Sequence, residues 1–120
     1  MQYHGGVKMI NFSQSKEFEE FVIALPKKDQ LKLLATIKSI QEHGLEVAIS
    51  MQWVKKLERD LYEIRSKYSS NFQRGIYFQL RDADYYITHG FTKKTQKTPQ
   101  REIDKAKRIR KQFKGGNKNG

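Results

Sequence analysis

The chain has 120 residues, which is enough for one domain with a small core and too few for two. Its content of 37% hydrophobic and 12% aromatic residues is typical of globular proteins and argues against a largely disordered chain. The net charge of +11 favours a polyanionic partner, which could be a nucleic acid, a membrane surface or an acidic protein.

Several other classes lack their usual features. The chain has no cysteine, which excludes disulfides and thiolate metal sites and fits a cytoplasmic protein. No apolar run approaches the ~20 residues of a membrane span, and no signal peptide is recognisable, so we expect no membrane association. His4, His43 and His89 lie far apart without a carboxylate cluster, and no glycine-rich phosphate loop precedes a helix. We therefore expect neither a metal ion nor a cofactor.

The chain divides into three unequal parts. Residues 1–8 show little pattern and are interpreted as an N-terminal extension, although Val7 to Phe12 resembles a short strand. Residues 9–114 are predicted to form the domain. The glycine-rich segment 115–120 is predicted to be a disordered tail.

Residues 15–44 predict a helical hairpin. Ser15 is a suitable N-cap, and Pro26 ends the first helix and begins the second. Gly44 is placed as the C′ glycine that ends the second helix. Apolar residues with helical spacing follow the cap, at Phe18, Phe21, Val22 and Leu25.

The second half predicts strands over 61–65, 72–80 and 85–92, joined by short turns and followed by a helix that opens at Pro99. Residues 45–57 give no clear prediction. The resulting order, β-αα-βββ-α, describes a small α+β domain: a mainly antiparallel sheet of about four strands, with helices packed on one side.

All three strands carry charged side chains on otherwise apolar faces. Arg74 lies among apolar positions of its strand, and Glu63 and Arg65 share a face with Leu61. A buried face rarely carries Arg or His unless an anion requires them, so the pattern favours one basic site for a phosphate backbone. On the last strand, one face is expected to hold Tyr85, Ile87, His89, Phe91 and Lys93.

Structural explanations remain open for each residue. Arg74 could form an ion pair with Glu63, and His89 could be a hydrogen-bonded core histidine. Lys93 and Lys94 could begin a solvated basic helix. From Lys93 onward the chain has eleven basic and two acidic residues, which gives this stretch nine of the eleven net positive charges.

These residues are suited to metal-free cleavage of RNA, in which the 2′-hydroxyl attacks the phosphate. Such a reaction needs a base, an acid and cations that stabilise the pentavalent phosphate. The same residues would also serve plain RNA binding. The cations available are Arg65, Arg74, Lys93 and Lys94, and the candidate bases are Glu63, His89 or a lysine with a lowered pKa.

A series of short motifs runs through roughly residues 9–113, beginning with Leu25-Pro26 at the end of the first helix. The motifs that follow are Val54-Lys55-Lys56-Leu57, Leu61-Tyr62-Glu63-Ile64-Arg65, Arg74, Tyr77-Phe78, His89-Gly90-Phe91, Lys93-Lys94, Lys97-Thr98-Pro99, Glu102-Ile103 and Ala106. In this order they resemble the RelE/HigB superfamily, and more narrowly its phage-derived, HigB-like branch.

This resemblance implies a RelE-like fold and the toxin of a type II toxin–antitoxin system. Such a toxin is a ribosome-dependent mRNA endonuclease that inhibits translation in the cytoplasm. The implied partners are the ribosome with its mRNA and a cognate antitoxin, a helix-turn-helix protein similar to HigA. Operator DNA would be bound only through the antitoxin.

The resemblance also implies residue roles. Arg65 and Arg74 match arginines that hold the phosphate, and Lys55 and Lys56 lie near a general-base position. Where many relatives place a catalytic His, Tyr or Arg, this chain has Lys93 and Lys94. The expected catalytic residues are Arg65, Arg74, Glu63, His89 and Lys93, and the expected RNA-binding residues are Lys55, Lys56, Lys94, Lys97 and Arg101. The alternatives are a non-catalytic nucleic-acid-binding module and a superfamily member with another target, such as DNA gyrase.

Overall fold

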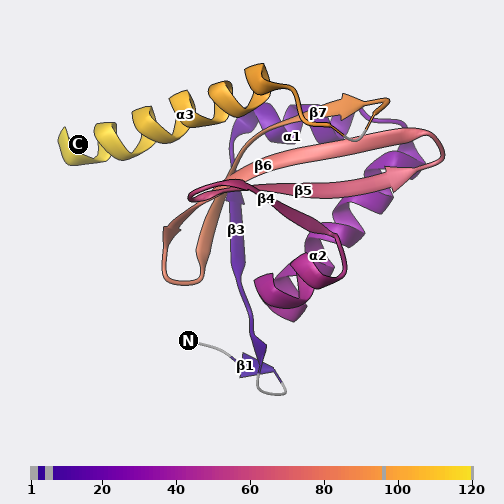
Figure 1. Cartoon of the computed structure of the whole chain (residues 1–120), viewed down its shortest axis with the longest axis horizontal. Coiled ribbons are helices and arrows are strands. Elements are labelled where there is room, and N and C mark those ends of the chain that lie inside the picture. Colours follow the sequence, from indigo (N-terminus) through magenta and orange to yellow (C-terminus); the bar gives the residue numbers. More distant parts are fainter. Residues whose placement is uncertain (1–2, 5–6, 96, 120) are drawn as a thin grey trace.

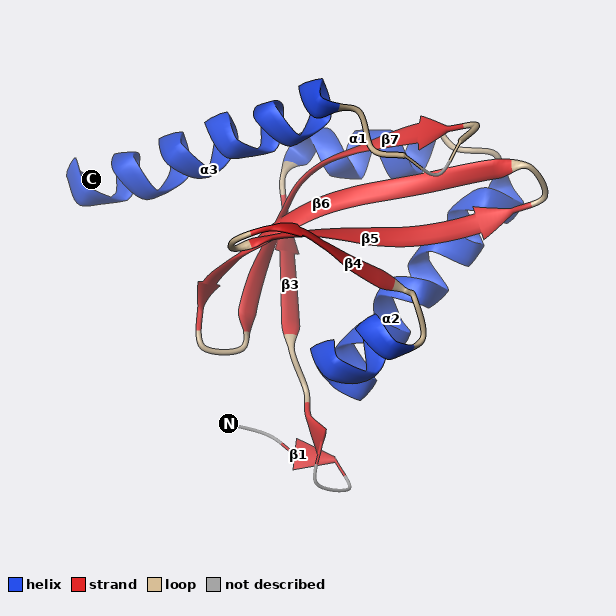
Figure 2. Cartoon of the chain, in the orientation of Figure 1, coloured by secondary structure: helices blue, strands red, loops and turns tan. Residues whose placement is uncertain are grey.

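The computed structural model describes residues 3–4, 7–95 and 97–119, and the side chains of 9–95 and 97–115. Three helices surround a five-stranded sheet, and a separate two-stranded sheet lies near the N-terminus (Figures 1 and 2). In chain order the elements are β1 (Tyr3–His4), β2 (Val7–Lys8), β3 (Asn11–Gln14), α1 (Lys16–Ala24), α2 (Lys27–Ser50), β4 (Val54–Glu58), β5 (Leu61–Tyr68), β6 (Asn71–Arg81), β7 (Asp84–Lys93) and α3 (Gln100–Asn119).

The main sheet has the strand order β3-β7-β6-β5-β4. Strands β4 to β7 form an antiparallel meander, and β3 runs parallel to β7. The predicted α+β class and mainly antiparallel sheet are therefore confirmed. The sheet has one strand more than expected, because β4 begins in the stretch 45–57 that gave no prediction.

The helices cover both faces of the sheet, so the prediction that they pack on one side is wrong. Helices α1 and α2 lie on one face, over a core that includes Phe18, Ile64 and Tyr77. Helix α3 packs on the other face, over Ile76 and Phe78. Because side chains alternate along β6, adjacent residues of one strand supply two separate cores.

The observed helix ends agree with some of the predicted capping residues and differ from others. The Ser15 hydroxyl accepts a hydrogen bond from the backbone N–H of Phe18 at 3.0 Å, which confirms the predicted N-cap. Gly44 has the positive φ of 85° expected of a C′ glycine, but it forms a kink within α2, and the helix continues to Ser50. The backbone of α3 is likewise helical beyond Gly115, as far as Asn119.

Candidate functional site

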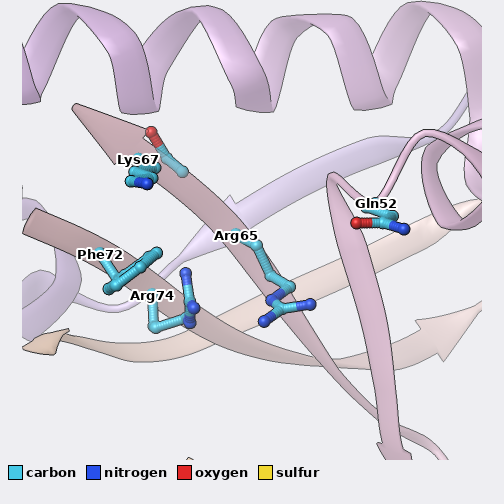
Figure 3. A pocket seen from close by; sticks show the side chains of 6 residues that line it. Gln52, Arg65, Lys67, Phe72 and Arg74 are labelled. Atoms are coloured by element: carbon cyan, nitrogen blue, oxygen red, sulfur yellow. The ribbon is translucent and has the colours of Figure 1, made fainter. Parts of the chain in front are cut away.

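An open pocket of about 170 Å³ lies on the α3 face of the sheet, beyond the part that α3 covers. Arg65 of β5 and Arg74 of β6 are cross-strand partners and both line it (Figure 3). Cross-strand partners share a face, so the pairing brings the two guanidinium groups together, as the sequence predicted. The remaining lining residues are Gln52, Ser66, Lys67 and Phe72.

Glu63 lies beneath the two arginines with no exposed surface. Its Oε1 is 3.4 Å from Nε of Arg74 and 3.6 Å from Nε of Arg65. The ion pair considered for Arg74 therefore exists, and it includes Arg65 as well. One carboxylate facing two guanidinium groups leaves a net positive charge in the pocket.

The two arginines differ in accessibility. The side chain of Arg74 is 2% exposed and that of Arg65 is 19% exposed. Burial lowers the pKa of Arg74, the negative charge of Glu63 raises it, and the positive charge of Arg65 lowers it further. An arginine remains protonated through such a shift, so Arg74 is a fixed, partly desolvated cation.

Phe72 and Lys67 also line the pocket, although neither was predicted as a site residue. The Arg74 guanidinium carbon lies 5.1 Å from the centre of the Phe72 ring, and Nζ of Lys67 lies 5.2 Å from it. Both contacts are within cation–π range. Their positions two residues from Arg65 and Arg74 on the same strand faces were the signal that could have identified them.

His89 lies on the α3 face but away from the pocket. A bulge at Thr88 shifts the register, so that His89 pairs with Ile76 while Ile87 pairs with Tyr77. The expectation that His89 shares a face with Tyr85 and Ile87 is therefore wrong, because alternation is interrupted between them.

The His89 side chain is 1% exposed and makes the contacts of a core histidine. Nδ1 lies 2.9 Å from the Thr88 hydroxyl, and Nε2 lies 3.1 Å from Oε1 of Glu102 on α3. Burial lowers the pKa of His89, and the hydrogen bond with Glu102 opposes this effect. This geometry links α3 to β7.

The predicted lysines divide between two faces. Lys55 pairs with Glu63 and so lies on the pocket face, whereas Lys56 pairs with Tyr62, whose ring stacks on Tyr77 of the opposite face. Lys93 pairs with Phe72, which places it on the pocket face as well.

The remaining predicted cations lie after β7. Lys94 donates a hydrogen bond to Asn71 Oδ1. Lys97 is exposed. Arg101 is 82% exposed, with its Nε 3.8 Å from Oε2 of Glu102. These three side chains extend the basic surface along the connection to α3.

Neither a metal cluster nor a membrane span is found in the part of the chain that the structure describes. No three His, Cys, Asp or Glu side chains among these residues are grouped to bind a metal ion. None of the described helices combines the length and apolarity needed to cross a bilayer. The side chains that line the pocket supply guanidinium, ammonium, hydroxyl and amide groups, together with the Phe72 ring.

The chain is similar to a protein family and to a solved structure. A family model described as phage derived protein Gp49-like (DUF891) matches residues 20–111. A crystal structure of an archaeal RelE–RelB complex from Pyrococcus horikoshii OT3 contains a similar chain, with a TM-score of 0.50 and 21% sequence identity. The similarity covers 68% of this chain and 92% of that one, and at this identity it shows a shared fold. The search of curated proteins gave no match.

Proposed function

Because this chain belongs to the phage-derived Gp49-like family, a RelE/HigB-type toxin family, we propose that it is a type II toxin that cleaves mRNA on the ribosome. The observation that carries this proposal is the pair of arginines, Arg65 and Arg74, in an open pocket on the uncovered end of a sheet face. Their fixed positive charge suits a phosphate group whose negative charge increases during reaction.

The pocket favours cleavage by the RNA's own 2′-hydroxyl. A scissile phosphate held by Arg65 would lie above Arg74, and both cations would stabilise the pentavalent transition state. The 2′-oxygen would bond to phosphorus while the bond to the 5′-oxygen breaks. A base takes the proton from the 2′-hydroxyl, and an acid supplies one to the leaving 5′-oxygen.

We assign proton transfer to the accessible lysines beside the arginines. Lys55 lies opposite Glu63 on the pocket face, and Lys67 lines the pocket. Glu63 and His89 are almost fully buried, so we give them positioning roles: Glu63 orients the arginines, and His89 holds α3 in place. We assign the RNA backbone to Lys93, Lys94, Lys97 and Arg101.

The proposed partners follow from the same comparison. RelE is described together with RelB in the similar structure, and we propose that this chain also binds a cognate antitoxin, a helix-turn-helix protein of the HigA kind. Operator DNA would then be reached through the antitoxin alone. The ribosome, mRNA and antitoxin together place the proposed activity in the cytoplasm.

Primer extension on a reporter mRNA tests the activity, using purified protein in EDTA with and without translating ribosomes. We expect cuts only with ribosomes. Arg65→Gln should slow cleavage by about a hundredfold or more, as loss of a transition-state cation does. The matched control is Arg81→Gln, which removes an exposed arginine at the far end of β6 and should cleave normally.

The outcomes separate the alternatives. Cuts on naked RNA would keep the ribonuclease and discard the dependence on ribosomes. No cuts with either substrate would favour a nucleic-acid-binding module or another target. Equal activity of Arg65→Gln and Arg81→Gln would remove the pocket from the mechanism.

A further inference from the structure

Thr98, in the segment that joins β7 to α3, contacts the buried carboxylate beneath the pocket. Its hydroxyl donates a hydrogen bond to Oε2 of Glu63. We propose that Thr98 is a positioning residue: its hydroxyl fixes the Glu63 carboxylate so that Arg65 and Arg74 present their guanidinium groups to the RNA phosphate. This inference rests on the proposed function and adds a residue to which no role has been assigned.

The contacts of Glu63 show why one hydroxyl can have this effect. Oε1 faces both arginines, but neither it nor Nε of Arg74 has a hydrogen-bond partner among the described residues. Within that part of the chain, the hydrogen bond from Thr98 is the directional contact that sets the rotation of the carboxylate. The arginines are attracted to Glu63 by charge, while Thr98 determines which way its oxygens point.

Thr98 itself is held by the residues that follow it. It precedes Pro99, which restricts its backbone to extended conformations. The Pro99 carbonyl accepts hydrogen bonds from the backbone N–H groups of Glu102, at 3.1 Å, and Ile103, at 3.4 Å. Glu102 in turn contacts His89 of β7 at 3.1 Å. The hydroxyl is therefore presented from the anchored start of α3.

Loss of the hydroxyl has a defined consequence. A carboxylate that is free to rotate can form a two-pronged ion pair with a guanidinium group, which is its preferred geometry. Glu63 would then draw Arg74 or Arg65 downward, out of the pocket, and its own Oε2 would lose its partner. The guanidinium would be less available to the transition state, while the lysines that bind the RNA backbone would be unchanged.

The kinetic test compares three variants in the ribosome-dependent cleavage assay. Thr98→Val removes the hydroxyl and keeps the branched shape, and Thr98→Ser keeps the hydroxyl. Thr95→Val changes an exposed threonine of the same segment and is the matched control. We expect Thr98→Val to lower kcat by about ten- to a hundredfold with KM little changed, which is the range for a hydrogen bond to a charged group. Thr98→Ser and Thr95→Val should cleave at nearly the wild-type rate.

A second measurement does not depend on activity. The Nε–Hε resonances of Arg65 and Arg74 in 15N-labelled protein report the environment of each guanidinium. Thr98→Val should shift both, whereas Thr98→Ser and Thr95→Val should leave them in place. Unchanged resonances in Thr98→Val would overturn the inference.

The two measurements distinguish failure of the inference from failure of the proposed function. Wild-type cleavage with an equally active Thr98→Val would overturn the positioning role alone. Equal slowing by Thr98→Val and Thr98→Ser would also overturn it, because the hydroxyl would not be the cause. If the wild-type protein cleaves nothing, the ribonuclease proposal fails, and the arginine resonances alone decide whether Thr98 sets the arginine pair.

Discussion

The two faces of the sheet are built from the same strands but serve different purposes. Toward α1 and α2, β6 presents Gly75 and Tyr77, which pack in the larger apolar core. Toward α3, it presents Ile76 under the helix and Arg74 beyond it. Both faces therefore have a core, but only the second also has a charged, open end.

The difference follows from how far each face is covered. Helix α2 lies along β5 and β4, and α1 lies on β7, whereas α3 packs on β6 and β7 over the core that contains Ala106. The uncovered end tolerates Arg65 and Arg74 because Glu63 balances one of their two charges and solvent reaches Arg65. The covered end beside it keeps the strands rigid, so the arginines have a firm support.

The largest expected effect is on the α1/α2 face. Phe18 is fully buried, and its ring lies where a side chain on Gly75 would be, 3.0 Å from the Cβ position. Phe18→Ala should lower the free energy of unfolding by about 3–5 kcal/mol, because it leaves a cavity in a closed core. Urea denaturation measures this. Phe72→Ala, in the open pocket, should destabilise much less and should instead slow cleavage. Equal destabilisation by Phe18→Ala and Phe72→Ala would show that the two faces contribute equally to stability.

A smaller effect is expected where α1 approaches the paired glycines of β6 and β7. A Cβ on Gly90 would lie 2.4 Å from Cδ2 and 3.0 Å from Cγ of Phe21, so the whole ring would have to move. Gly90→Ala should cost about 1–3 kcal/mol of unfolding free energy by overpacking. The matched control is Gly115→Ala in α3, where a Cβ meets nothing within 4 Å and alanine favours the helix. Thermal unfolding should show opposite shifts for the two variants.

Substitution of the adjacent lysines Lys55 and Lys56 of β4 tests which face of the sheet contributes to cleavage. Lys55→Ala should slow ribosome-dependent cleavage by about a hundredfold, the low end of the range for loss of a general acid or base. Lys56→Ala removes the same charge from the opposite face and should have no effect on the rate. Cleavage rates at matched ionic strength measure both. Equal losses would mean that net charge, rather than the pocket face, determines the rate.

The smallest expected effect is a pH dependence that reports the link between α3 and the sheet. Burial lowers the pKa of His89 below its ordinary value of 6.5. As the pH falls through 6.5, the unfolded chain therefore takes up a proton before the folded chain does. The free energy of unfolding should be highest above pH 6.5 and decrease below it, toward the lower folded pKa. His89→Gln should flatten this slope in urea titrations between about pH 7.5 and pH 5.5. A slope identical to that of the wild-type protein would show that His89 does not contribute to it.

Local patterns were enough to predict much of this protein. The Ser15 cap, the helical spacing after it and the alternation on β5 and β6 depend on neighbouring residues, so they can be read directly from the sequence. The same alternation placed Arg65 with Glu63 and Leu61, and the pairing of β5 with β6 then put Arg74 on the same face. The resemblance to the RelE/HigB superfamily, which came from the order of motifs, is confirmed by the family match and the shared fold.

Other features required the tertiary structure. The bulge at Thr88 turns His89 toward α3, and a bulge depends on the register of the partner strand, which no local pattern specifies. The packing of α3 on the second face brings Glu102 to His89, and the segment that leads into α3 brings Thr98 to Glu63. These contacts join residues far apart in the chain, and they form only when long-range pairing brings their elements together. The sequence therefore determines the local elements and the faces within an uninterrupted strand. The cluster of Glu63, Thr98, Arg65 and Arg74 forms only when the chain folds, because its members come from β5, β6 and the segment before α3.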